Sequence, residues 1–463
     1  MLYPLAGSAK NNYLLLTVSG LALGAMVSFL PLEYFMPFIM VSAGFLISAF
    51  LIFTSAREGE RGGLLAIFST ALFIRLFLSV SFFLLSFSFN QAALIGMGKI
   101  KYTPGFLFYN DSWAYNLNGW YLLRIWLRDA YSFMNMLTFS STGNVSEYDW
   151  VNAFVYFFTG YNPLCLFIMN SLAGAVTVIP LYFLARRIFS KNAAILAASV
   201  FALWPSHILW CTQNLKEPIS VFFCVFCVWF LFAFKESHKP GYFILFCLSF
   251  FLFWKFRMEI AIVVALTVMF SYIVSIKKLK DFLITLSFIA AVYFLFDIFV
   301  ARYFFSTDVV KHVIDFNILF EKLSVLKQAR GAYGATGFLP QSDITTLSGV
   351  LQVLPTGVFY MLFKPFPWEF QGGLQFFASI EMLFWYLFLP FFCVGIYKAF
   401  KNNWSSVSVL VVFIVLMTLL MALIESNAGT MYRHRSVIWA FNIIFIAGGL
   451  AAVMKGANEA KNA

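Results

Sequence analysis

Long apolar runs separated by short polar segments dominate the sequence. A helix that crosses a bilayer needs about 20 mostly apolar residues, and most of these runs approach or exceed that length. The runs are continuous and do not alternate, which indicates helices and not the strands of a membrane barrel. The pattern predicts about twelve spanning helices, near residues 13–30, 35–54, 64–89, 164–185, 193–211, 219–234, 241–256, 259–276, 282–304, 374–397, 404–424 and 437–454.

Two segments between the runs are much longer than the others, at residues 90–163 and 305–373. No tandem repeat, heptad pattern or low-complexity linker divides the chain. The sequence therefore predicts a single integral membrane domain over residues 1–463, an all-α helical bundle with re-entrant or interfacial helices in its two large loops.

Basic residues orient this bundle. Short loops rich in Lys and Arg alternate with loops that have few of them, which by the positive-inside rule places the basic loops and both termini in the cytoplasm and both long loops outside. Residues 351–363 are apolar over too short a stretch to span, so we expect a re-entrant or interfacial segment there. The loops that set this orientation contain Arg57 and Arg61, Arg186 to Lys191, Lys235 and Lys239, and Lys277 to Lys280.

Composition supports a membrane protein and excludes other classes. The chain is 62% apolar and 11% charged, with a mean hydropathy of +0.86, whereas soluble domains are about 25% charged. The net charge of +11 is scattered over short loops, which indicates orientation and contact with membrane lipid, not nucleic acid. The six cysteines lie in apolar runs, so we interpret them as small buried side chains.

Several cations break the orientation rule. Lys216, Arg257, Arg433 and Arg435 lie at the predicted outer ends of helices, where Lys and Arg should be rare. Converging cations near lipid headgroups suit a phosphate or pyrophosphate ligand. The alternative is that they are interface residues or local ion pairs, for example with Glu217.

The first long loop contains Asp111 beside Trp113 and Tyr115. An acid among aromatic side chains suits a general base in a cleft that binds sugar, because aromatic faces pack against sugar rings. The alternative is a helix cap, since Asn110 or Asp111 could begin the helix that follows.

Other polar positions have less specific interpretations. His434 lies between two arginines, should be neutral, and could hydrogen-bond a sugar. Trp368 could line an acceptor cleft or anchor the chain at the membrane interface. Residues 330–337 contain three glycines without the spacing of a phosphate loop, which favours a flexible hinge or lid. Arg75, inside an apolar run, is expected to form a structural pair, and His207 is expected to be a core histidine.

The chain resembles a known family over about residues 90–260. The first loop from Asp111 to Tyr115, together with later motifs, resembles the bacterial GT-C membrane glycosyltransferases, in the mannosyltransferase-like and aminoarabinose-transferase-like branch of glycosyltransferase family 39. Residues 360–368 and 427–435 resemble a bacterial subset tied to cell-surface polysaccharide. The later motifs of the branch are Asn162-Pro163, Asn170 to Thr177, Leu184 to Phe189, Ala202 to Pro205 and Lys216-Glu217-Pro218.

The resemblance implies a donor sugar linked to polyprenyl phosphate, used outside the cytoplasmic membrane of a bacterium. Asp111 would deprotonate the acceptor hydroxyl, and Glu217 would orient Lys216 or act as a second acid that binds acceptor or metal. Many relatives carry two adjacent acids at this place, whereas here Asp111 is followed by Ser112. This difference weakens the case for a bound divalent cation, so no cofactor is predicted with certainty. The donor phosphate would bind Lys216, Arg257, Arg433 and Arg435, and the sugars would contact Trp113, Tyr115, His434 and Trp368.

The sequence thus predicts a membrane glycosyltransferase that moves a sugar from a polyprenyl-phosphate carrier to a glycan or glycolipid acceptor. Two alternatives stay open: a polysaccharide polymerase or ligase that acts on glycans linked to polyprenyl diphosphate, and a transporter of lipid-linked glycans. Polar clusters at helix ends, not at the bilayer midplane, favour an enzyme over a transporter. Other polysaccharide-assembly proteins would be its partners.

Overall fold

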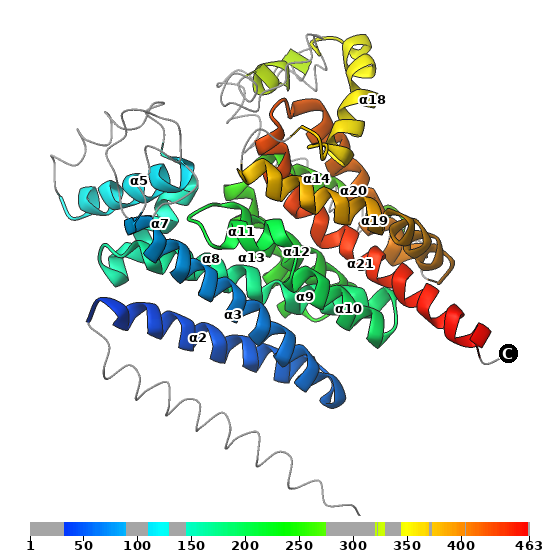
Figure 1. The fold of residues 1–463 in the computed structure, drawn as a ribbon, viewed down its shortest axis with the longest axis horizontal. Coiled ribbons are helices and arrows are strands. Elements are labelled where there is room, and N and C mark those ends of the chain that lie inside the picture. Colours follow the sequence, from blue (N-terminus) through cyan, green and yellow to red (C-terminus); the bar gives the residue numbers. More distant parts are fainter. Residues whose placement is uncertain are drawn as a thin grey trace, which may run out of the picture. The chain divides into compact units, whose positions relative to one another are not determined.

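The computed structural model describes residues 32–88, 110–128, 145–274, 320–321, 323–328, 344–369, 373–402 and 404–461. Within these ranges every regular element is a helix (Figure 1). The helices are α2 (Leu32–Ser55), α3 (Glu58–Ser88), α5 (Asn110–Trp126), α7 (Glu147–Thr159), α8 (Pro163–Val176), α9 (Val178–Ile188), α10 (Lys191–Ala202), α11 (Pro205–Cys211), α12 (Glu217–Ser237), α13 (Pro240–Phe256), α14 (Met258–Ile273), α18 (Leu347–Phe363), α19 (Gly373–Asn402), α20 (Trp404–Ile424) and α21 (Ala428–Lys461).

The helices confirm a multi-pass membrane protein. Seven described stretches are long and apolar enough to span a bilayer, or eight if the bent pair α10–α11, which turns by 53°, counts as one span. The predicted count of about twelve is not confirmed. Predicted runs 241–256 and 259–276 correspond to the shorter helices α13 and α14, and runs 13–30 and 282–304 lie outside the described residues.

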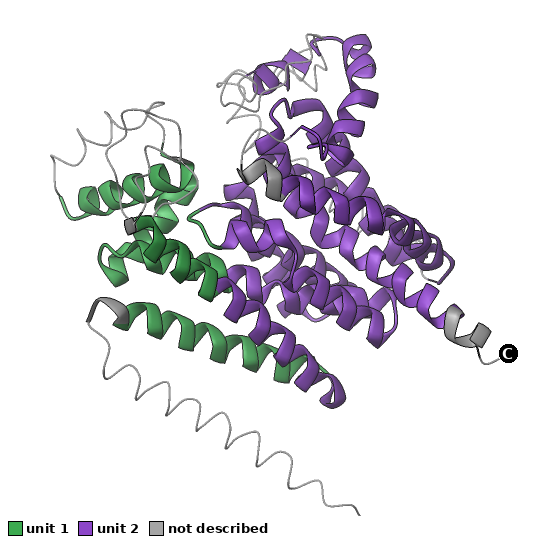
Figure 2. Cartoon of the chain, in the orientation of Figure 1, with its two compact units in different colours: residues 1–56, 76–172, 212–214 green, residues 57–75, 173–211, 215–463 purple. Residues whose placement is uncertain are grey.

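The chain forms two compact units (Figure 2). Unit 1 contains residues 1–56, 76–172 and 212–214, and unit 2 contains residues 57–75, 173–211 and 215–463. The single domain inferred from the sequence stays a prediction.

In unit 2, glycines bring helix backbones close together. A side chain at Gly449 on α21 would collide with the Phe391 carbonyl of α19, and one at Gly395 on α19 would collide with the Phe445 carbonyl of α21. In a bilayer, helices associate through such close packing, because lipid tails are as apolar as the helix surfaces.

In unit 1, helix α7 has its polar side inward. Ser146 and Asp149 form a capping box at its start, and Gly119 of α5 packs directly on Asn152. The exposed face is instead aromatic, which is typical of a helix at a membrane interface and not of one in water. The buried face holds Tyr148, Asp149, Asn152, Ala153 and Tyr156, and the exposed face holds Trp150, Phe154, Phe157 and Phe158.

The second long loop is described only in part. Its apolar segment forms α18, a helix of 17 residues with Pro355 inside it. Whether α18 is re-entrant or interfacial stays a prediction. The glycine-containing segment 330–337 lies outside the described residues.

Candidate active site

A charged cluster in unit 2 is built around the carboxylate of Glu217. Its Oε1 accepts hydrogen bonds from Nη2 of Arg257 at 2.5 Å and from Nη2 and Nε of Arg433 at 3.0 and 3.2 Å. Glu217 and Arg257 are 2% and 5% exposed. Three residues singled out in the sequence therefore meet in one buried group.

Helix ends position each member of this cluster. Glu217 begins α12, where the partial positive charge of a helix N-terminus favours a carboxylate. Arg257 lies between α13 and α14 with non-helical backbone angles (φ −148°, ψ 73°). Arg433 lies in the second turn of α21. Helix ends suit these charges because a charge inside an apolar helix is costly.

Lys216 is the cation of this cluster with the fewest contacts. Over the described ranges its ammonium has neither a hydrogen-bond nor an ion-pair partner, and it is half-buried. The neighbouring charge of Arg257, followed by burial, lowers the pKa of Lys216 to about 8, although Glu217 and Glu259 oppose this shift. An ammonium held near other cations is an arrangement that favours binding of an anion.

His434 joins the cluster through a second acid. Its Nε2 lies 2.7 Å from Nη1 of Arg257, and its Nδ1 lies 2.6 Å from Oε1 of Glu425. Thr430 donates to the other oxygen of Glu425 at 2.6 Å. Sequence reasoning missed Glu425 and Thr430, although a carboxylate directly after the apolar run of α20 and close to His434 was an available signal. We call Lys216, Glu217, Arg257, Glu425, Arg433 and His434 the charged cluster.

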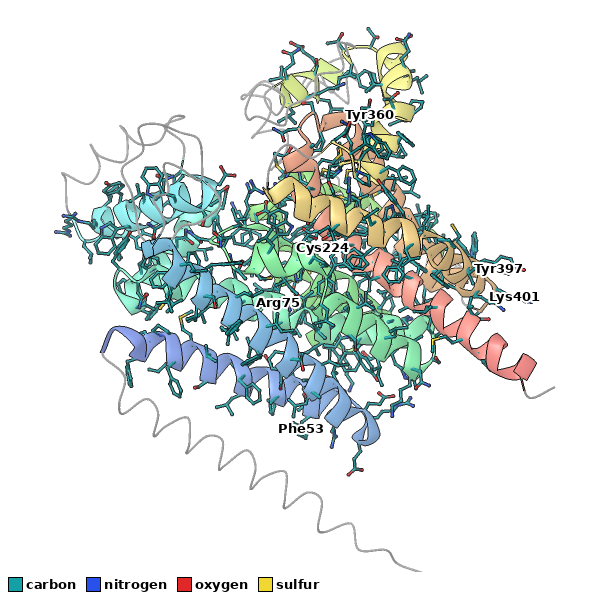
Figure 3. The ribbon with its side chains drawn as sticks, in the orientation of Figure 1. Phe53, Arg75, Cys224, Tyr360, Tyr397 and Lys401 are labelled. Carbon is teal, nitrogen blue, oxygen red and sulfur yellow. The ribbon has the colours of Figure 1, made fainter. Side chains whose placement is uncertain are left out.

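Arg435 points to a different place in unit 2. Its Nη2 donates to the carbonyl of Lys364 at 2.6 Å and to that of Tyr360 at 3.4 Å, and its side chain is 2% exposed. Tyr360 lies on α18 (Figure 3). Trp368, a few residues further, stacks on Phe366 with ring centroids 5.2 Å apart and is 76% exposed. Arg435 therefore links α21 to the Lys364–Trp368 segment.

The predicted base lies in unit 1. Asp111 is exposed in the first turn of α5, and the next residue, Ser112, accepts hydrogen bonds from the backbone and side-chain amides of Asn214 at 3.0 and 3.2 Å. The two aromatic residues predicted to contact sugar have packing partners. Trp113 packs on the cluster of Leu164, Phe167 and Ile168, and Tyr115 meets Tyr148 edge to face at 5.1 Å.

Unit 1 also contains a neutral polar group. Asn116 accepts from the hydroxyl of Tyr156 and donates to that of Tyr161 at 3.0 Å. Asn170 accepts from Tyr148 at 3.2 Å and donates to the carbonyl of Gln213 at 2.6 Å. We call the buried residues Asn116, Asn170, Gln213 and Asn214, with the tyrosines that bond them, the amide network.

Two other buried polar residues have structural surroundings. Arg75, labelled in Figure 3, donates to the carbonyls of Ala71 and Ala202 at 3.0 and 2.8 Å, and so contacts the end of α10 at the bend before α11. The Nε2 atom of His207 lies 3.8 Å from Sγ of Cys211. Among the described residues, no group of three or more His, Cys, Asp or Glu side chains could hold a metal ion.

Comparison with known proteins agrees with the class expected from the sequence. Residues 147–300 match the family model described as dolichyl-phosphate-mannose-protein mannosyltransferase. This match confirms the predicted resemblance to the GT-C membrane glycosyltransferases, over a segment that includes Lys216, Glu217 and Arg257. A search of curated proteins finds no match.

Two solved structures are similar in fold at low identity. The apo oligosaccharyltransferase of Archaeoglobus fulgidus aligns with a TM-score of 0.48 and 13% identity, over 85% of this chain and 51% of that one. The oligosaccharyltransferase AglB from Archaeoglobus fulgidus, in complex with an inhibitory peptide and a dolichol-phosphate, aligns with a TM-score of 0.47 and 12% identity, over 88% and 52%. The chain spans about half the length of these two proteins.

Proposed function

We propose that this protein is a GT-C glycosyltransferase that moves a sugar from a polyprenyl-phosphate carrier to a glycan or glycolipid acceptor on the outer side of a bacterial cytoplasmic membrane. The observation that carries the proposal is the charged cluster, in which Lys216, Arg257 and Arg433 lie around the carboxylate of Glu217. The match to a family whose name specifies a lipid-phosphate sugar donor supports it.

The grouped cations of the cluster suit a phosphate ligand. The three cations lie against the carboxylates of Glu217 and Glu425, which leaves one positive charge in excess within the cluster, and the partly exposed Glu259, 3.8 Å from Arg257, offsets it. Guanidinium groups hold phosphate oxygens through paired N–H groups, and an ammonium adds a point charge. A lipid phosphate that leaves with its bonding electrons would be stabilised by these cations.

In the proposed reaction, Asp111 accepts the proton of the acceptor hydroxyl while that oxygen bonds to the anomeric carbon of the sugar. The bond between this carbon and the phosphate oxygen breaks, and the lipid phosphate leaves. Glu217 orients Arg257 and Arg433, because one of its oxygens already accepts from both. A role for Glu217 as a free second acid is therefore less favoured than the sequence suggested.

A transfer assay with matched variants tests this proposal. Purified protein in nanodiscs would receive radiolabelled polyprenyl-phosphate sugars and glycan acceptors, with diphosphate-linked glycans as a separate donor. We expect Asp111→Asn to lower transfer by about 100-fold or more, the contribution typical of a general base, and to leave donor affinity within about 2-fold.

The control is Glu147→Gln, which removes an exposed acid from the first turn of another helix in unit 1 and should leave transfer unchanged. Equal turnover in Asp111→Asn and wild type would refute Asp111 as the base. Turnover of diphosphate-linked glycans alone would identify a polymerase or ligase, and lipid binding without any transfer would favour a transporter.

A further inference from the structure

A continuous chain of hydrogen bonds links an acid that sequence reasoning missed to the proposed phosphate-binding arginine. It runs from Thr430 to Glu425 (2.6 Å), to His434 (2.6 Å), to Arg257 (2.7 Å) and to Glu217 (2.5 Å). Glu217, Arg257, Glu425 and His434 are only 2% to 7% exposed.

The partners of His434 determine where its proton lies. The guanidinium of Arg257 has only donors, so Nε2 of His434 must accept and carries no hydrogen. A neutral imidazole has one ring hydrogen, which must then be on Nδ1, where it is donated to Oε1 of Glu425. A second proton on the ring would place an N–H against the guanidinium and break the contact with Arg257. The geometry is therefore compatible only with a neutral His434 protonated on Nδ1.

A neutral acceptor at this place orients Arg257 without neutralising it. The two terminal nitrogens of Arg257 each have a fixed partner, His434 on Nη1 and Glu217 on Nη2. If Glu425 contacted Arg257 directly, its charge would cancel more of the positive charge. The imidazole ring of His434 separates the carboxylate of Glu425 from Arg257. The N–H groups of Arg257 that His434 and Glu217 do not occupy remain for a ligand.

We propose that His434, held by Glu425 in its neutral Nδ1-protonated form, is a positioning residue that fixes the guanidinium of Arg257 for binding of a lipid phosphate. This inference rests on the function proposed above. Glu425 and Thr430 are the outer members of the same positioning chain.

The protonation state can be measured without any assay of function. The chain has four histidines, so nitrogen-15 NMR of histidine-labelled protein in nanodiscs gives few signals, and His434→Gln identifies that of His434. We expect the Nδ1–H form, unchanged between about pH 6 and pH 8. The charged groups around the ring are Arg257, Glu425, Glu217 and the adjacent Arg433. An Nε2–H signal, or a protonated ring in this range, would overturn the inference.

A pair of conservative variants separates positioning from packing. The amide oxygen of a glutamine reaches the place of Nε2 and can accept from Arg257, whereas the shorter asparagine reaches only the place of Nδ1. With farnesyl phosphate as the probe, we expect His434→Gln to bind within about 3-fold of wild type and His434→Asn to lose about 10-fold or more, the size of a hydrogen bond to a charged group. Thermal unfolding of both variants measures any change in packing.

The outcomes separate this inference from the proposed function. If the two variants lose affinity equally, or in proportion to their loss of stability, His434 is a packing residue and the inference is wrong. Inorganic phosphate and farnesol, tested beside farnesyl phosphate, separate recognition of the phosphate from that of the lipid. If wild type binds no phosphate-containing probe, the role toward phosphate is wrong, whereas transfer that depends on Asp111 would leave the proposed function standing.

Discussion

The two units bury polar side chains in opposite ways. The amide network of unit 1 is neutral, and its asparagines bond tyrosine hydroxyls and backbone carbonyls. The charged cluster of unit 2 relies on ion pairs between the carboxylate of Glu217 and two arginines at helix ends. A neutral network is satisfied once each donor has an acceptor, whereas a charged cluster must also balance its charge.

This difference indicates different tasks. The hydrogen bonds of the amide network join neutral groups within unit 1 and hold α5, α7 and α8 together, and the side-chain oxygens of Gln213 and Asn214 are buried without a partner over the described ranges. In the charged cluster, Oε2 of Glu217 is buried without a hydrogen-bond partner over the described ranges, and Lys216 has no ion-pair partner there. A cation without an ion-pair partner, such as Lys216, is suited to bind an anion, whereas hydrogen bonds between neutral groups are suited to structure.

The largest effect should come from removing the central carboxylate of the charged cluster. We expect Glu217→Ala to destabilise the protein by about 3–5 kcal/mol, because it leaves Arg257 and Arg433 buried beside each other without their shared partner. Unfolding by SDS in mixed micelles measures this. The control is Glu236→Ala at the other end of α12, where the carboxylate is 61% exposed in its ion pair with Arg187 and should contribute less than about 1 kcal/mol. Equal losses in the two variants would show that the buried carboxylate of Glu217 contributes no more to stability than an exposed ion pair.

A smaller effect is expected in the amide network. Asn116→Leu should destabilise by about 1–3 kcal/mol, because the buried hydroxyl of Tyr156 loses its acceptor. Combining it with Tyr156→Phe should recover part of this loss, since neither member of that pair then has an unpaired polar group, while the hydroxyl of Tyr161, which also loses Asn116, belongs to an exposed residue. The same SDS titration at low and high salt should give the same values. A strong dependence on salt would show that the network is not electrically neutral.

The smallest effect concerns the protonation of Lys216. Because its pKa is lowered to about 8, the ammonium loses its charge as the pH rises through that value. The affinity for farnesyl phosphate should therefore fall by about 10-fold between pH 7 and pH 9, and Lys216→Arg, which stays charged, should remove most of this fall.

The free energy of unfolding should rise with pH over the range in which the affinity for farnesyl phosphate falls. Unfolding returns Lys216 to its usual pKa of 10.5, so between about pH 8 and that value the unfolded chain binds more protons than the folded one. The contribution of Lys216 to the free energy of unfolding therefore rises with pH while ligand affinity falls. An affinity that falls equally in Lys216→Arg would show that another group titrates.

Much of the charged cluster could be predicted from the sequence, because charges at the ends of apolar runs are conspicuous. Lys216, Glu217, Arg257, Arg433 and His434 were all found in this way and lie together in unit 2. Glu425 was missed although it lies directly after the apolar run of α20, because the sequence does not say which way such an acid will turn. Arg435 was grouped with Arg433 because they are neighbours in sequence, although helix geometry directs residues two apart to different sides.

The sequence by itself determined that this chain is a multi-pass helical membrane protein, since the transfer free energy of each apolar run depends only on its own residues. It also determined which charges are unusual. Only the tertiary structure decided which partner each charge meets, because these bonds join residues 40, 177 and 216 positions apart. Such pairings depend on how the helices pack, and close approach at residues such as Gly395 and Gly449 sets that packing.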